Sequence, residues 1–152
     1  MSLQQRIQAD LTAAMKARDR ARVSALRMAM AAIRNAAVEA ARGAQGELAD
    51  ETVEQLLRRE VKRRREAARS YRDAGREDRA AAEEAEAEVY ASYLPAPLTD
   101  QELVAIVDRA FATTGAQGPQ DMGKVMGAAM PEIRGRADGG RVSALVRARL
   151  AG

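Results

Sequence analysis

The chain has 152 residues, which is enough for one ordinary domain or two small ones. It contains no cysteine and no histidine, so thiol nucleophiles, Ser-His and Cys-His relays, disulfides and most transition-metal sites are excluded. The chemistry that remains is carboxylate acid–base catalysis, a lysine or hydroxyl nucleophile, Mg²⁺ bound by carboxylates, or binding alone. The net charge of +3 is too small to indicate a nucleic-acid partner by itself, so the distribution of the cations must decide.

The first residues contain no apolar leader segment. No apolar stretch approaches the roughly 18 residues that a membrane span needs. We therefore expect a cytoplasmic protein with no membrane partner, and the absence of cysteine agrees with a reducing compartment.

Four amphipathic helices are predicted before residue 94. Ser2 and Gln5 form a capping box at the start of the first, and the others cover about 19–42, 50–74 and 78–93. Gly43 follows the second helix, and Gly75 suits the left-handed position that often ends a helix. The positions expected to be buried are, in chain order, Leu3, Ile7, Leu11 and Met15; Val23, Leu26, Met30, Ile33 and Ala37; Val53, Leu57, Val61, Ala68 and Tyr71; and Ala82, Ala85, Val89 and Tyr93.

Pro95 and Pro97 interrupt the helical pattern and indicate a boundary between two domains, residues 1–94 and 95–152. Beyond it, Thr99 and Glu102 form a second capping box, and two further helices are predicted over about 121–133 and 138–150. No segment alternates like a strand. The predicted fold class is all-α, with an N-terminal four-helix unit followed by a small three-helix domain.

The third predicted helix has a line of cations. At about 100° per residue, six of them fall within a strip about 80° wide, and we expect the apolar positions on the far side. This basic stripe consists of Arg58, Lys62, Arg65, Arg69, Arg72 and Arg76. It can follow a phosphate backbone, or it is a solvated face that acidic residues on the next helix partly neutralise. Those acidic residues are Glu83, Glu84, Glu86 and Glu88.

A sparser set of cations lies on the second predicted helix, and the same two interpretations apply to it. Its members are Arg20, Arg27, Arg34 and Arg42. No aromatic platform accompanies either set, which argues against the usual single-strand RNA modules. If the protein binds RNA, we expect a folded or double-helical one, gripped through its backbone and shape.

Two motifs in the C-terminal part remain open between packing and binding. Gly123 and Gly127 lie together on one helix beside Lys124, so they indicate either tight helix packing or a small groove. Farther on, Gly135 suits a helix end and Asp138 a helix N-cap. The arginines around this turn also form a credible phosphate seat at a helix N-terminus; they are Arg134, Arg136 and Arg141.

A string of short motifs resembles the YqeY-like family. The string is Tyr93-Leu94-Pro95 with Pro97-Leu98, the run Asp121-Met122-Gly123-Lys124-Val125-Met126-Gly127, Met130-Pro131, and Gly135-Arg136-Ala137-Asp138-Gly139. The N-terminal half matches in layout through its Ser-Leu opening, Leu26-Arg27-Met28 with Asn35, and the charged third helix. The resemblance therefore covers essentially the whole chain.

That family shares its C-terminal part with the tail of the GatB subunit of glutamine-dependent aminoacyl-tRNA amidotransferases. The resemblance implies an all-helical two-part fold and contact of the tail-like domain with tRNA. Family names that invoke a carbon–nitrogen ligase with glutamine as amido-N-donor reflect the chemistry of a partner, because this chain has no counterpart of the catalytic parts.

We therefore predict a non-catalytic accessory module that binds tRNA or another folded RNA and takes no cofactor and no metal. The candidate nucleic-acid-binding residues are Arg58, Lys62, Arg65, Arg69, Arg72, Lys124, Arg134 and Arg136, and the structural motif residues are Gly123, Gly127, Gly135 and Asp138. The alternative is a protein-interaction module that docks on an amidotransferase or an aminoacyl-tRNA synthetase without touching RNA. An enzyme with its own glutaminase activity is a third hypothesis, which the missing cysteine and histidine disfavour.

Overall fold

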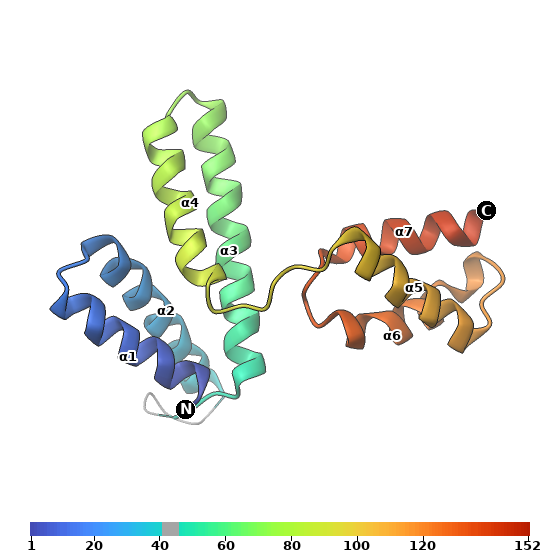
Figure 1. The fold of residues 1–152 in the computed structure, drawn as a ribbon, viewed down its shortest axis with the longest axis horizontal. Coiled ribbons are helices and arrows are strands. Elements are labelled where there is room, and N and C mark those ends of the chain that lie inside the picture. Colours follow the sequence, from blue (N-terminus) through green and yellow to red (C-terminus); the bar gives the residue numbers. More distant parts are fainter. Residues whose placement is uncertain (41–45) are drawn as a thin grey trace. The chain divides into compact units, whose positions relative to one another are not determined.

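The computed structural model describes residues 1–40 and 46–152, and over these residues the protein is all-helical, as predicted. Arg42 and Gly43, at the predicted end of the second helix, lie outside the described residues. Figure 1 shows the helices in chain order: α1 (Leu3–Lys16), α2 (Arg20–Glu39), α3 (Asp50–Asp73), α4 (Glu77–Ala91), α5 (Asp100–Thr114), the single-turn 3₁₀ helix η1 (Pro119–Asp121), α6 (Met122–Ile133) and α7 (Gly139–Ala151).

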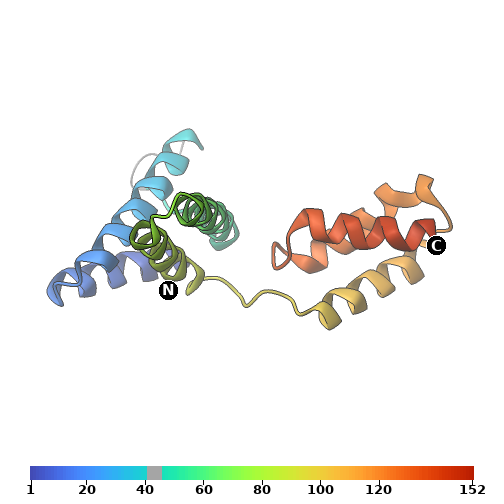
Figure 2. The ribbon, with the colours of Figure 1, turned by 90° about the horizontal axis from the view of Figure 1, so that it is seen from above.

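The chain divides into two compact units, Met1–Leu94 (unit 1) and Pro95–Gly152 (unit 2). Unit 1 consists of two helical hairpins, α1–α2 and α3–α4. The α1–α2 hairpin lies across the α3–α4 hairpin near the end at which α3 begins, as the two views in Figures 1 and 2 show. The other half of the α3–α4 hairpin, toward the Gly75 turn, projects beyond α1 and α2. Only the first half of the α3–α4 hairpin is therefore covered by α1 and α2.

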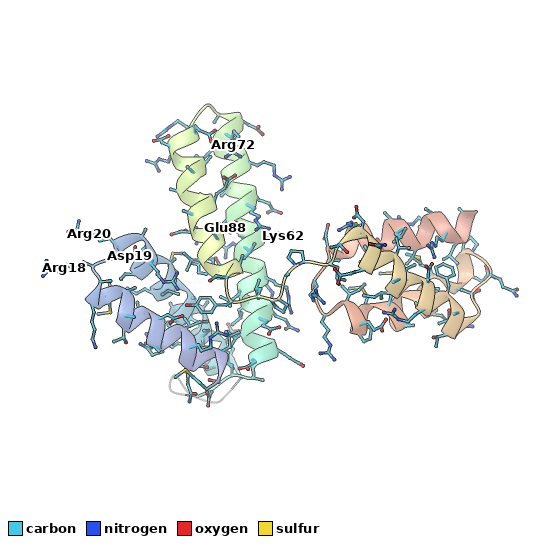
Figure 3. The ribbon with its side chains drawn as sticks, in the orientation of Figure 1. Arg18, Asp19, Arg20, Lys62, Arg72 and Glu88 are labelled. Atoms are coloured by element: carbon cyan, nitrogen blue, oxygen red, sulfur yellow. The ribbon has the colours of Figure 1, made fainter. Side chains whose placement is uncertain are left out.

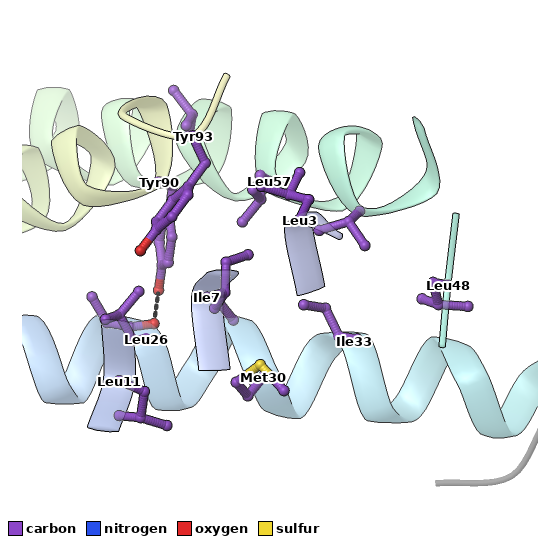
Figure 4. Packing of buried hydrophobic residues seen from close by; sticks show 14 of the residues in the cluster. Leu3, Ile7, Leu11, Leu26, Met30, Ile33, Leu48, Leu57, Tyr90 and Tyr93 are labelled. Atoms are coloured by element: carbon purple, nitrogen blue, oxygen red, sulfur yellow. Dashed lines mark hydrogen bonds between the residues drawn. The ribbon is translucent and has the colours of Figure 1, made fainter. Parts of the chain in front are cut away.

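The main core of unit 1 lies where the two hairpins cross. Its largest fully buried side chains include Ile7, Leu26, Ile33, Leu57 and Tyr90. Figure 4 shows these side chains packing between α2, α1 and the α3–α4 pair. Ala68 and Ala80 are also buried but lie outside this cluster, in the projecting half of the α3–α4 hairpin. Small side chains suffice there because two helices meet without a third layer.

Two tyrosines fix the end of α4 to the rest of unit 1. The Tyr90 hydroxyl is buried and donates a hydrogen bond to the Ala25 carbonyl of α2 at 3.0 Å, drawn as the dashed line in Figure 4. The Tyr93 hydroxyl donates to Asp10 Oδ2 of α1 at 2.5 Å. Burial raises the pKa of Tyr90 to about 12, and burial together with the Asp10 hydrogen bond raises the pKa of Tyr93.

These raised pKa values predict alkaline destabilisation of unit 1. Because both tyrosines favour the neutral phenol when folded, the stabilisation is complete below pH 10, the ordinary tyrosine pKa. The Tyr90 contribution is lost as the pH rises from 10 to about 12, and the Tyr93 contribution is lost as the pH rises above 10, with a slope of at most about 1.4 kcal/mol per pH unit for each tyrosine. Urea unfolding at increasing pH measures this loss, and Tyr90→Phe should flatten the slope. An unfolding midpoint that does not change over this pH range would contradict the prediction.

The prediction that Met15 is buried is wrong. Its exposed fraction is 51%, and Ala14 is buried instead. At about 100° per residue, Ala14 lies only about 20° from Leu3 around the helix, whereas Met15 lies about 120° away. Met15 therefore faces solvent at the end of α1.

The predicted buried face of α4 is confirmed at Tyr93 and partly at Val89, which packs against the core, but it is wrong at the two alanines. Ala82 and Ala85 are exposed, and the buried side is formed by Ala80, Ala87 and Tyr90. Alanines occur on every side of α4, so the apolar pattern selects no face. The bulky Tyr90 ring and its bond to α2 decide the rotation of the helix.

Unit 2 packs α5, α6 and α7 around its own core. The predicted Thr99–Glu102 capping box starts α5, and Gly115 ends it with φ 63°. The Asp138 carboxylate caps α7 by accepting the Gly140 N–H at 3.4 Å. The buried side chains are Leu98, Leu103, Ile106, Val107, Ala110, Val125, Ala129, Ile133, Val142, Val146 and Leu150.

Candidate nucleic-acid interface

The basic stripe lies beside the packing face of α3 and not on the far side of the helix, which corrects the expectation from the sequence. The buried residues of α3 are Val53, Leu57, Val61 and Ala68. Around the helix their mean direction is about 95° from that of the stripe. The stripe therefore borders α4, and acidic side chains of α4 reach it.

Most cations of the basic stripe are paired with carboxylates of unit 1. Arg65 pairs with Glu88 of α4 at 3.6 Å, and Arg72 pairs with both Glu77 and Glu84 at 3.0 Å. The remaining two pairs are Arg58 with Glu54 at 3.5 Å and Arg76 with Asp78 at 3.8 Å. The partial neutralisation that the sequence left open is therefore present.

Arg72 and Glu77 form the tightest of these pairs. Hydrogen bonds from Arg72 to Glu77 and Glu84 raise the Arg72 pKa, and the hydrogen bond from Arg72 lowers the Glu77 pKa. Both groups therefore keep their charges at neutral pH. Figure 3 places Arg72 near the end of the projecting hairpin and Glu88 farther along α4.

Two members of the stripe, Lys62 and Arg69, are exposed and form no ion pair within residues 1–40 and 46–152. Arg69 lines a shallow groove between α3 and α4, together with Arg65, Arg72, Ala81, Glu84, Ala85 and Glu88. Because this groove mixes both signs of charge, the cations of the stripe that are free for a polyanion within the described residues are Lys62 and Arg69; Arg59, outside the stripe, is also exposed and unpaired there.

Arg64, which sequence reasoning did not single out, is the cation that α3 turns inward. Its guanidinium lies 3.5 Å from Glu60, 3.3 Å from Glu83 and 3.4 Å from Glu86. Burial lowers the Arg64 pKa, but Glu86 and Glu83 outweigh that effect and the net shift is upward. A signal for it exists in the sequence, because position 64 lies in the gap between the apolar positions Val61 and Ala68. Arg64 and these three glutamates, which we call the Arg64 cluster, join α3 to α4.

The C-terminal candidates lie on α6 and on the turn after it. Lys124 is 71% exposed and lies 3.8 Å from Asp121. A hydrogen bond from the Gln117 N–H lowers the Asp121 pKa, and Lys124 contributes the smallest of the effects on it. Arg134 is exposed, adopts φ 50°, and forms no ion pair within the part of the chain that the structure describes. Lys124 and Arg134 are therefore accessible to a ligand.

Arg136 instead ties the start of unit 2 together. Its Nε donates to the Ala96 carbonyl at 2.8 Å, and its own carbonyl accepts the Leu98 N–H at 2.8 Å. Its guanidinium also lies 3.9 Å from Glu102. The side chain thus fixes the segment after Pro95 to the turn between α6 and α7, and Gly135, with φ 74°, makes that turn possible.

Gly123 and Gly127 do not serve packing within the described residues. Apart from the adjoining backbone of α6 itself, a Cβ added at either position would meet no described atom within 4 Å. Both are exposed on α6 beside Lys124. They leave an open edge of helix backbone on the surface of unit 2.

Comparison with known proteins now decides the family. Residues 4–150 match the family described as Yqey-like protein. The chain belongs to the YqeY-like family. The match spans both helical units, so neither is an addition to the family's sequence. A comparison with curated proteins gives no significant match.

The structure of this YqeY-like protein also bears on metal binding and on membrane spanning. Over residues 1–40 and 46–152, no group of three or more Asp or Glu side chains is placed to hold a metal ion. Among the described helices, none combines the length and apolarity needed to cross a membrane.

Proposed function

We propose that this protein is a non-catalytic, cytoplasmic RNA-binding module whose partner is tRNA or another folded RNA. The observation that carries the proposal is the pair Lys62 and Arg69, two exposed cations on one side of α3 that form no ion pair with any described residue. They lie seven residues apart, or about 10.5 Å along the helix. A phosphate backbone presents regularly spaced charges to such a row, and each contact releases counterions.

The ion pairs of the neighbouring arginines are compatible with this function. Arg65 and Arg72 are half-exposed, with carboxylate partners on the surface. Exposed pairs of this kind contribute little stability, so a polyanion can exchange for the carboxylate at small cost. Arg58 is less accessible, because its side chain is only 24% exposed. We therefore expect Lys62 and Arg69 to contribute most to RNA affinity on α3, and Arg65 and Arg72 less.

Of the candidate residues in unit 2, Lys124 and Arg134 are accessible, and we expect a weaker contribution from them. The resemblance of the C-terminal motifs to the GatB tail supports tRNA as the partner. Any link to amide transfer would then run through a partner enzyme, because the chain has neither cysteine nor histidine.

The test is binding of unfractionated tRNA across a salt series. Wild-type protein should bind at low salt, with affinity that falls steeply as salt rises. The variant Lys62→Gln/Arg69→Gln should bind about tenfold more weakly, and its slope of log affinity against log salt should be smaller by about 2. Filter binding or fluorescence anisotropy measures both quantities.

The matched control is Arg59→Gln/Arg63→Gln. It removes the same charge from the same helix but outside the basic stripe, so its affinity should stay close to that of the wild type. Equal losses in the two double variants would remove the stripe from the interface. Absence of tRNA and duplex-RNA binding by the wild type at low salt would refute the proposed function.

A second candidate function is docking on an amidotransferase or an aminoacyl-tRNA synthetase without RNA contact. The open backbone edge at Gly123 and Gly127 favours it, because a partner helix can approach closely where side chains are absent. Retention of such an enzyme on the immobilised protein after nuclease treatment would favour docking over RNA binding.

A further inference from the structure

The excess positive charge of this protein is concentrated in its first two helices. Residues 1–40 contain seven Lys and Arg against three Asp and Glu, a net charge of +4. Residues 50–91, which include the basic stripe, contain ten against twelve, a net charge of −2. The whole chain has a net charge of +3. A long-range attraction for polyanions therefore centres on α1 and α2 and not on α3.

A concave surface lies at the turn between α1 and α2, where this charge gathers. It is lined by Met15, Arg18, Arg20, Val23, Ser24 and Arg27, and we call it the tip surface. Arg20, Ser24 and Arg27 share one side of α2 at spacings of four and three residues. Met15 and Val23 give the surface an apolar floor, because Met15 faces solvent and Val23 is half-buried. Figure 3 shows Arg18 and Arg20 extending outward from the turn.

Within the described residues, the arginines of the tip surface differ from most arginines of the basic stripe in having no acidic partner. Arg18, Arg20 and Arg27 form no ion pair within residues 1–40 and 46–152. The only carboxylate in the turn, Asp19, caps α2 by accepting the Arg22 N–H at 3.2 Å. Around α2 the arginines also lie about 120° from the buried face, so acidic residues of neighbouring helices do not reach them.

Arg18 occupies a backbone position that favours glycine. Its φ is 56°, in the left-handed region. The Arg18 N–H donates to the Met15 carbonyl, and the Asp19 N–H donates to the Ala14 carbonyl, which is the Schellman arrangement that usually ends in glycine. The corresponding positions after α3 and α5 are Gly75 and Gly115. An arginine here strains the turn, as Arg134 does after α6. The Arg18 side chain forms no hydrogen bond or ion pair within residues 1–40 and 46–152 that would offset this strain, so it is available to a ligand.

Guanidinium groups suit phosphodiesters, because they donate paired hydrogen bonds to two phosphate oxygens. Arg34 continues the row of Arg20 and Arg27 along α2, with about 10.5 Å between successive members. A linear row matches a chain of phosphates better than it matches a single anion. The apolar floor and the arginine planes can also receive the flat face of an unpaired base.

We propose that the tip surface, extended by Arg34, is the main phosphodiester-binding surface of this protein and holds the backbone of the bound RNA. This inference rests on the proposed function and identifies its principal site. It reverses the order expected from the sequence, in which the stripe on the third helix ranks above the sparser row on the second.

The experiment compares two double variants of the full chain with labelled, unfractionated tRNA. Arg20→Gln/Arg27→Gln should bind at least about tenfold more weakly than the wild type, with a salt slope smaller by about 2. Its loss should exceed that of Lys62→Gln/Arg69→Gln. The control Arg79→Gln/Arg147→Gln has the same net charge but lies outside both surfaces, and it should bind within about twofold of the wild type. Circular dichroism checks that every variant is folded.

The substitution Arg18→Gly separates binding from folding. It should raise the midpoint of thermal unfolding by a few degrees, because the turn is relieved of strain, and lower tRNA affinity severalfold. A loss of affinity together with a loss of stability would contradict the inference, since the arginine would then be structural. Polyglutamate added as a competitor should displace tRNA poorly, and displacement at the same charge concentration would show a general acidic-partner surface instead.

The binding experiments distinguish failure of the tip surface from failure of the RNA-binding function. If the wild type binds tRNA but Arg20→Gln/Arg27→Gln behaves like the control, the tip surface is refuted and the RNA-binding function stands. If the wild type binds neither tRNA nor duplex RNA at low salt, the RNA-binding function fails, and the tip surface fails with it.

Discussion

Tyr90→Ala is expected to lower the free energy of unfolding of unit 1 by about 4 kcal/mol, the largest effect of any single change considered for this protein. Tyr90 is the largest of the fully buried side chains and lies where α4 meets α2. Its removal leaves a cavity among Leu26, Ile7 and their neighbours. It also leaves the Ala25 carbonyl without its hydroxyl donor. Guanidinium unfolding followed by far-ultraviolet circular dichroism measures the loss.

Tyr90→Phe keeps the ring and removes only the hydroxyl, so it distinguishes packing from hydrogen bonding. We expect a smaller loss of about 1–2 kcal/mol. This variant also gives a measurable answer if Tyr90→Ala fails to fold. Equal stability of Tyr90→Phe and the wild type would show that the bond to Ala25 contributes nothing, and a small effect of Tyr90→Ala would show that the ring is not part of the core.

Arg64→Met is expected to destabilise unit 1 by about 2 kcal/mol, which is the second largest effect. The methionine fills a similar length, but it leaves Glu60, Glu83 and Glu86 without the cation between them. Three carboxylates that share a half-buried site then repel one another. The same denaturant titration measures the change, and partial recovery is expected when Glu83→Gln and Glu86→Gln are added.

Arg63, next to Arg64 in the sequence, supplies a matched control for the Arg64→Met substitution. Arg63 is 73% exposed, whereas Arg64 is 18% exposed, although both lie near Glu60. Arg63→Met should therefore change the free energy of unfolding by less than about 0.5 kcal/mol. Similar effects of the two substitutions would show that burial of the Arg64 cluster does not matter.

Helix ends were predictable because their determinants are local. A capping box needs only residues three positions apart, so Ser2 with Gln5 and Thr99 with Glu102 were evident without any tertiary contact. Glycine at a left-handed helix end is equally local, as at Gly75. Arg18 and Arg134 are the exceptions, because a non-glycine residue in the left-handed region gives no sign of its conformation in the sequence.

The candidate site was less predictable, because the availability of a charge depends on its neighbours in space. Arg65 and Lys62 look alike in the sequence, but only Arg65 has a carboxylate of α4 within reach. The row on α2 looked weaker because it is sparse, yet its described members Arg20, Arg27 and Arg34 form no ion pair within residues 1–40 and 46–152. Counting all cations ranks the basic stripe first, whereas counting only the described cations without an acidic partner ranks the row on α2 first.

The sequence by itself determined that the protein is all-helical and excluded the catalytic chemistry that needs cysteine or histidine. Both follow from composition and from periodicity within single helices. Only the tertiary structure decided which face α4 buries, which arginine of α3 turns inward, and which of the described cations have no carboxylate partner. All three properties depend on where a neighbouring helix lies. The local sequence pattern does not contain that position, least of all on an alanine-rich helix such as α4, which has no distinct apolar face.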